Sequence, residues 1–302
     1  MTYSLGSIST TQFYDRANRA MSGLSSKADA LQTSISTGKK LVAPSSDSAA
    51  YQRLRTMAKD TADDAAYAGN LKLAATSLKQ ADTTLDAIGT QLQRAGELAI
   101  QARNGTQNDA SRAAIAAEID QIAESIAGLA NTKDARGQYV FGGLDGAAAV
   151  TPKDGGGYTL ATTTGAAIPT GDGQSVQTGE AAARVFKVGD KDAFQVLAAL
   201  SAALKTAGGD DAATGAAIDD LSAAGTQVST VQSSLGARAA RVELEQTRLT
   251  DVGTDREEAR SAIEDTDISA AVIDLQKTMT ILQATQASFT KLQGLSLFDY
   301  LR

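Results

Sequence analysis

The chain has 302 residues, enough for two or three domains with a buried core. It contains no His, Cys or Trp, which excludes zinc sites built from Cys and His, His-dependent nucleophilic catalysis, thiolate chemistry and disulfides. The net charge of -7 argues against a general nucleic-acid-binding protein, because such proteins are normally basic.

The composition favours long helices. Hydrophobic residues make up 42% of the chain, with Ala dominant among them, and only 4% of residues are aromatic. Such a chain, with few Pro, is typical of helices that pack closely through small side chains. The first ten residues contain no basic segment and no apolar run, so we expect no cleaved secretory signal. No apolar run approaches the roughly 18 residues of a membrane-spanning helix, so we expect no membrane insertion.

An apolar seam predicts a first helix over residues 11–37. Its positions recur at spacings of three and four, and Gly38 follows as a helix-ending residue. The seam consists of Ala17, Met21, Leu24, Ala28, Leu31 and Ile35. Next, the segment Pro44–Asp47 predicts a turn with capping side chains, which opens a weaker helix through Tyr51, Leu54 and Met57.

The strongest periodicity of the chain follows and predicts a coiled-coil helix that ends at Asn104-Gly105. Its seam is Leu71, Ala74, Leu78, Ala81, Leu85, Ile88, Leu92, Ala95, Ala99 and Ala102. A returning antiparallel helix is predicted from the same rhythm in Ile115, Ile119, Ile122, Ile126 and Leu129.

The composition changes over residues 137–192, which are rich in Gly and contain Pro152 and Pro169. β-prone pieces at 139–141, 158–160 and 184–188, separated by turns, predict short strands. We expect residues 144–190 to pack as a separate β unit whose deletion leaves the helices intact. A short helix over about 194–204 and a Gly/Asp-rich break at 208–211 are predicted to follow.

The helical pattern then resumes. One heptad position reads Leu221, Val228, Leu235, Val242, Leu249, Arg256 and Ile263. The second position carries Arg238 and Glu245 where apolar residues are expected, which indicates either a single buried stripe or polar residues that fix the helix register. A final helix is predicted after the acidic segment Glu264–Asp267, with Gln286 interrupting its seam. That seam consists of Ile268, Val272, Leu275, Met279, Leu282 and Phe289.

These elements predict a mainly α fold: a long antiparallel coiled-coil rod made by the N- and C-terminal regions, with a small β-rich central insert. We divide the chain into terminal assembly helices (1–45 and 264–302), a helical rod (46–136 and 194–263) and the insert (137–193). The predicted rod core is Leu71, Leu78, Leu85, Ile88, Leu92, Ile115, Ile119, Ile122, Ile126, Leu221, Val228, Leu235, Val242 and Leu249.

The terminal helices differ from the rod because Ser, Thr and Gln dilute their seams. One such pair buries too little apolar surface to be stable alone, so we expect these helices to order against neighbouring copies of the chain. Their opposite net charges mildly favour antiparallel pairing. The predicted intermolecular interface is Met21, Leu24, Leu31, Ile35, Ile268, Val272, Leu275, Met279, Leu282, Phe289, Leu297 and Phe298.

The residues that remain for catalysis form no convincing site. Paired carboxylates occur at 63–64, 210–211, 219–220 and 257–258, but adjacent residues on a helix do not face each other. We therefore expect no catalytic residue, no cofactor and no metal site, and no enzymatic activity.

Two separated blocks of sequence resemble the flagellin family. Residues 34–40 (SISTGKK) with 44–50 (PSSDSAA) are similar to a stretch near the start of its members, and 263–267 (IEDTD) with 284–289 (ATQASF) are similar to its C-terminal block. Within the family, residues 137–143 (GQYVFGG) and the ending 295–301 (LSLFDYL) resemble the subunits that join hook to filament. The final Arg302 resembles filament subunits instead.

The resemblance implies a structural, self-assembling subunit of the extracellular flagellum, exported through the flagellar type III channel without a cleaved signal. It implies assembly with other copies, with a neighbouring hook-associated protein and with flagellin, and an export chaperone. A filament subunit remains the alternative within the family. A surface adhesin that binds a glycan through the central insert is the alternative outside it.

Overall fold

The computed structural model describes residues 10–41, 43–45, 47–104, 107–154 and 157–300. The helices in this part of the chain are α1 (Thr10–Thr37), α2 (Ser48–Ala102), α3 (Asp109–Ala130), α4 (Ala182–Val185), α5 (Ala193–Lys205), α6 (Asp211–Glu264) and α7 (Ile268–Tyr300). Three short antiparallel hairpins lie between α3 and α5: β1 (Val150–Pro152) with β2 (Tyr158–Leu160), β3 (Ile168–Gly171) with β4 (Gln174–Val176), and β5 (Lys187–Val188) with β6 (Lys191–Asp192). The predicted mainly α fold with a small β-rich insert is confirmed.

Local sequence signals set the ends of these helices. Gly38 follows α1 with a φ of 71°, which glycine adopts without strain. The Asp47 carboxylate accepts hydrogen bonds from the backbone N–H groups of Ala49 and Ala50 at 3.0 and 2.9 Å and caps α2. The Asn108 side chain caps α3 by accepting from Ser111, and Asp192 forms a reciprocal capping box at the start of α5.

The structure differs from the predicted elements in two places. The two helices expected before Asn104 are one continuous helix, α2, because Asp47 caps it and no later residue interrupts it. Of the three expected strands, 158–160 is β2, and the end of the third, 187–188, is β5, whereas residues 184–185 belong to α4. In the first, Tyr139 forms an isolated bridge with Lys133, and residues 140–141 lie in a turn. Short apolar runs do not distinguish a strand from a buried turn or a short helix, and tertiary packing decides between them.

The chain forms two compact units. The terminal unit comprises Met1–Thr61 and Val252–Arg302, and the central unit comprises Ala62–Asp251. The boundaries fall inside α2 and α6, so each of these helices contributes to both units.

The core of the central unit lies among α2, α3, α5 and α6. Every predicted rod-core residue is buried in it. Polar contacts tie neighbouring helices together: Arg94 of α2 binds Glu118 of α3 at 2.8 Å, and Lys205 of α5 binds Asp120 of α3 at 2.8 Å. The buried apolar seam therefore provides most of the stability of the helix packing. The ion pairs lie at its exposed margin, where each contributes little to the free energy of folding.

The insert shares this core, which contradicts the expectation that it packs separately. Phe141, Val150, Ile168 and Phe186 are buried in the same apolar cluster as the helix seams. The ring of Phe194 on α5 lies 5.0 Å from that of Phe186 and 4.6 Å from that of Tyr158 on β2, measured between centroids. The short hairpins are too small to form a core of their own, so they bury their apolar side chains against the helices.

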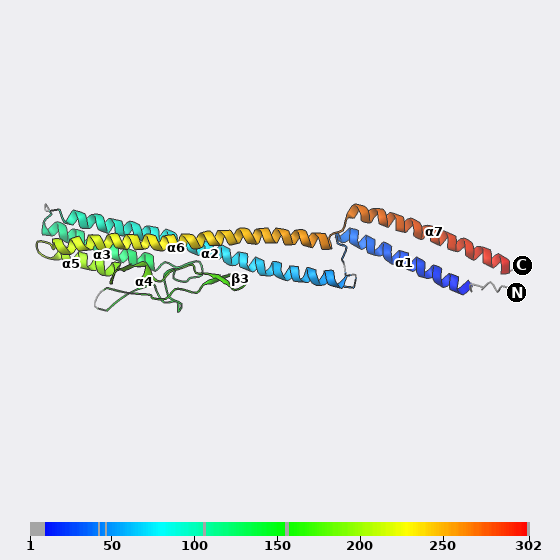
Figure 1. Cartoon of the computed structure of the whole chain (residues 1–302), viewed down its shortest axis with the longest axis horizontal. Coiled ribbons are helices and arrows are strands. Elements are labelled where there is room, and N and C mark those ends of the chain that lie inside the picture. Colours follow the sequence, from blue (N-terminus) through cyan, green and yellow to red (C-terminus); the bar gives the residue numbers. More distant parts are fainter. Residues whose placement is uncertain (1–9, 42, 46, 105–106, 155–156, 301–302) are drawn as a thin grey trace. The chain divides into compact units, whose positions relative to one another are not determined.

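In the terminal unit, α1 packs antiparallel to α7 (Figure 1). The ring of Tyr14, near the start of α1, lies 5.5 Å from that of Phe289 in an edge-to-face arrangement, while Lys39, just after α1, forms an antiparallel bridge with Asp265, just before α7. Few residues of this unit are buried: in its described part they are Ala28, Ala271 and Thr278. Small side chains at the contact allow close approach but bury little apolar area.

Candidate assembly surfaces

The seam between α1 and α7 uses one side of each helix. On α1 the half-buried or buried positions include Met21, Leu24, Ala28, Leu31 and Ile35, at spacings of three and four. On α7 they are Ala271, Leu275, Thr278, Leu282, Thr285 and Phe289, with the same spacings. The α1 seam is the predicted one, whereas that of α7 is rotated toward smaller residues.

This rotation leaves an apolar strip on α7 uncovered. Ile268, Val272 and Met279 are 52%, 37% and 43% exposed. At 3.6 residues per turn, their spacings of four and seven place them on one side of the helix, next to the buried seam. We call these three residues the α7 strip. Ile273 and Ile281 are also exposed but lie on other sides of α7.

The predicted intermolecular residues therefore fall into three groups. Met21, Leu24, Leu31 and Ile35, with Leu275, Leu282 and Phe289, lie partly buried along the α1–α7 pair. The α7 strip is exposed. Leu297 and Phe298 lie in α7, but their side chains are outside the described part of the chain. Their role between copies of the chain stays a prediction.

A polar clasp joins the end of α1 to the connection between α6 and α7. The backbone N–H of Lys40 donates to the carbonyl of Glu264 at 2.8 Å, and that of Thr266 donates to the carbonyl of Gly38 at 2.9 Å. The Glu264 carboxylate, only 13% exposed, contacts Lys39 Nζ at 2.5 Å and Arg260 at 2.9 Å. The segment 34–40 that resembles the flagellin family ends in this clasp, as does the segment 263–267.

Arg260 also shapes the electrostatics of the clasp. It donates to the Glu257 carboxylate at 2.5 and 2.9 Å, and this hydrogen bonding lowers the pKa of Glu257. The same bonds raise the pKa of Arg260. Both groups are therefore charged at neutral pH, and Glu257, one of the paired carboxylates of the sequence, serves an ion pair and not an acid–base pair.

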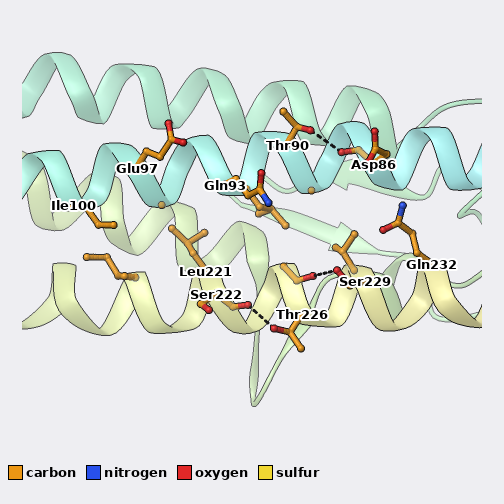
Figure 2. Close-up of a pocket in the computed structure, with 16 residues that line it drawn as sticks. Asp86, Thr90, Gln93, Glu97, Ile100, Leu221, Ser222, Thr226, Ser229 and Gln232 are labelled. Carbon is orange, nitrogen blue, oxygen red and sulfur yellow. Dashed lines mark hydrogen bonds between the residues drawn. The ribbon is translucent and has the colours of Figure 1, made fainter.

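A groove between α2 and α6 in the central unit has a volume of about 830 Å³ (Figure 2). Three of the hydroxyl groups that line it are engaged within their own helices: Thr90 donates to the Asp86 carbonyl, Thr226 to that of Ser222, and Ser229 to that of Gly225. None of these three hydroxyl groups donates to a basic side chain, which activation for nucleophilic catalysis requires.

The described residues offer neither a cluster of metal-binding side chains nor a membrane-spanning helix. They contain no group of three or more acidic side chains arranged to hold a metal ion. None of their helices combines the length and the apolar character needed to cross a membrane.

Two regions of the chain match models of a known protein family, and they contain the helices that form these surfaces. Residues 8–145 match the bacterial flagellin N-terminal helical region, and residues 218–301 match the bacterial flagellin C-terminal helical region. The chain belongs to the flagellin family. The two matched regions include α1, α7 and both sides of the clasp. Most of the insert lies between the two matched regions.

Individual relatives are similar over 72% to 96% of the chain. Flagellar hook-associated protein 3 of Escherichia coli K12 is 27% identical, with 96% of this chain and 98% of that protein aligned. A structure from Vibrio parahaemolyticus, assigned to the flagellar hook-associated proteins, has a TM-score of 0.68 at 19% identity and covers 73% of this chain and 100% of its own. The flagellar junction protein of Legionella pneumophila has a TM-score of 0.57 at 13% identity, covering 72% and 100%. The two structures share the fold.

Sequence reasoning did not find the role of Arg238 in this flagellin-family chain. Its guanidinium donates to the carbonyls of Gln177 and Gly179 at 3.2 and 3.1 Å and to the Glu180 carboxylate at 2.9 Å. The sequence indicated a special role for Arg238 only by placing it at a heptad position where an apolar residue is expected. The other such residue, Glu245, accepts from Arg248 on the same helix at 2.6 Å, which lowers the pKa of Glu245.

Proposed function

We propose that this chain is a structural subunit of the bacterial flagellum that forms the junction between hook and filament. Membership of the flagellin family supports a structural role in the flagellum. The names of its relatives, a hook-associated protein and a junction protein, support the position at the junction. No catalytic role is part of the proposal.

The α7 strip is the observation that carries this proposal. The two α7 residues that are buried are small, Ala271 and Thr278, and the large residues of its seam are only half-buried. Beside that seam, α7 exposes Ile268, Val272 and Met279. Exposed apolar residues aligned on one helix are typical of a protein–protein contact. Copies of the chain assemble by covering this strip with the terminal helices of a neighbour, which adds the apolar burial that the α1–α7 pair lacks.

This role also determines where we expect the chain to lie and how it is exported. It lies outside the cell in the flagellum, with a neighbouring hook-associated protein on the hook side and flagellin on the filament side. It reaches this place through the flagellar type III channel, without a cleaved signal and with the help of an export chaperone. Thin burial in the terminal unit suits such a route, because a weakly packed helix pair unfolds at little cost.

The test replaces the strip with small polar residues in the triple variant I268S/V272S/M279S. Because all three side chains are exposed, we expect a melting temperature within about 3 °C of the wild type. Cells that carry only this variant should be secretion-competent and have hooks without attached filaments, with the variant and flagellin released into the medium.

Leu244→Ser is the matched control. Leu244 is 70% exposed but lies on α6 in the central unit, and so belongs to another unit than the strip. This control should assemble and support motility. Normal filaments on cells that carry the triple variant would overturn the role of the strip, and long filaments of the purified wild-type protein in electron micrographs would favour a filament subunit.

A further inference from the structure

The insert contacts both long helices of the central unit. On α2, Asn70 Nδ2 donates to the carbonyl of Pro169 in β3 at 2.9 Å, and the Tyr67 hydroxyl donates to Asp172, in the turn after β3, at 2.9 Å. On α6, Arg238 holds the segment that follows β4. The β3–β4 hairpin and the residues after it, 168–180, therefore bridge α2 and α6.

The contact on α6 includes a buried carboxylate. The Glu180 side chain is only 6% exposed and lies against two guanidinium groups, that of Arg238 at 2.9 Å and that of Arg184 at 3.1 Å. Arg238 itself is 25% exposed and uses two further donors on backbone carbonyls of the same segment. If the Glu180 carboxylate lost the Arg238 guanidinium, it would still be buried away from water but would lack the ion pair that offsets the cost of desolvation. Separating the segment from α6 is therefore unfavourable.

The backbone of the segment is fitted to its place as well. A Cβ atom on Gly179 would lie 2.1 Å from the carbonyl oxygen of Val140, so only glycine permits this approach. Ile168 and Val176, which are paired across the hairpin, are both buried in the core that contains the seams of α2 and α6. The segment is therefore held by apolar packing between its two polar attachments.

At this level, the facing sides of α2 and α6 combine large buried residues, Leu78, Leu235 and Val242, with small ones. A groove of about 460 Å³ separates them and is lined in part by Ala75, Gly236 and Ala239. Small residues along a helix pair reduce the apolar area that the pair buries. Near α3 and α5, by contrast, the two long helices have additional helices packed on them.

We infer that residues 168–180 form a strap across α2 and α6, closed by Arg238 and Glu180, and that this strap sets the distance between the two helices at the level of Ala75 and Ala239. The insert is then a structural part of the helical body, in addition to any surface that it presents outward. This inference concerns the central unit and does not depend on where the chain lies in the flagellum.

The absence of Cys permits a direct measurement on the full-length chain, because two introduced Cys residues are the only labelling sites. Spin labels at Thr76→Cys and Ala240→Cys report the distance between α2 and α6 at the strap. Labels at Ile100→Cys and Ser222→Cys report it at the other groove, where α3 and α5 pack. Each pair is measured in the wild-type background and with Arg238→Met, which keeps the length of the side chain and removes its donors.

With Arg238→Met, the 76–240 distance should become longer and its distribution broader, and the 100–222 distance should stay unchanged. Backbone amides of 168–180 should exchange with deuterium about tenfold faster or more. Arg241→Met, three residues further along α6 and exposed, is the matched control and should change neither readout.

Glu180→Gln keeps the shape of the partner and provides the same test should Arg238→Met fail to fold. It should give a smaller change in the same direction, because the carbonyl contacts of Arg238 remain. Unchanged 76–240 distances in both variants would overturn the inference, and so would faster exchange in 168–180 without a change of distance, since the segment would then be attached without holding the helices.

Discussion

Leu85 lies in the middle of the α2 seam and is fully buried, as is Ile88 one turn later. Replacing Leu85 with Asp places a carboxylate without a partner in an apolar core, which costs roughly 3–5 kcal/mol. We expect a fall in the melting temperature of about 10 °C or more, measured by circular dichroism. Leu244→Asp, at a 70% exposed position, is the control and should melt close to the wild type. Equal melting curves for the two variants would show that the α2 seam is not core.

Replacing Gly179 or Gly225 with Ala should change the stability of the chain in opposite directions, because the two glycines have different surroundings. A Cβ atom on Gly179 would collide with a backbone carbonyl, whereas one on Gly225, in the middle of α6, would meet nothing within 4 Å. Gly179→Ala should destabilise the chain by about 1–3 kcal/mol. Gly225→Ala should stabilise it by about 0.5–1 kcal/mol, because alanine is the better helix former. Chemical denaturation of both variants measures the two signs, and a Gly179→Ala variant as stable as the wild type would contradict the close approach.

At the scale of elements, the insert is the part whose removal should be most costly to the fold. Deleting residues 144–190 and joining the ends with a short Gly/Ser bridge removes Val150, Ile168, Val176 and Phe186, all buried. Each such side chain contributes roughly 1.5–3 kcal/mol through burial. We expect loss of helical signal or a large drop in melting temperature. A deletion variant that remains helical and as stable as the wild type would show that the insert packs separately after all.

The seams of α2, α3 and α6 were predictable because large apolar residues recur there at fixed spacings and are buried where the pattern places them. The seam of α7 was predicted in part, since Leu275, Leu282 and Phe289 do lie on it. Side-chain size favoured Ile268, Val272 and Met279, but the structure buries Ala271 and Thr278, because small residues let two helices approach closely.

The insert shows a second limit of sequence reasoning. Its strands are two to four residues long, and their pairing depends on contacts with distant helices, such as that of Arg238 with residues 177–180. An Arg at an apolar heptad position signals a special contact but does not name its partner. Residues 139–141 illustrate the same problem, since Phe141 is fully buried without belonging to a strand.

At the scale of the whole molecule, stability and assembly should separate between the two units. The central unit contains nearly all of the buried apolar side chains described, and the terminal unit contains two small ones, Ala28 and Ala271. Removing residues 1–40 and 264–302 should therefore leave a helical core that melts within about 5 °C of the full chain, while abolishing incorporation into the flagellum. Circular dichroism of the truncated chain and microscopy of complemented cells measure the two effects.

Limited proteolysis of the intact, dilute chain gives the same separation. Trypsin should cut at Arg16, Arg19 and Lys291 well before it cuts between Leu71 and Ala102, because the α1–α7 pair opens at lower cost than the core of the central unit. If the ends resist digestion as long as the central helix does, the terminal helices are stable without neighbours.

The proposed place of the chain in the flagellum can be observed directly. Purified flagella with attached hooks, labelled with a gold-conjugated antibody against this chain and viewed by electron microscopy, report where the chain lies along the structure. We predict label confined to a short zone where hook and filament meet, and none on flagella from a deletion strain. Label distributed along the whole filament would contradict the junction assignment and identify the chain as a filament subunit.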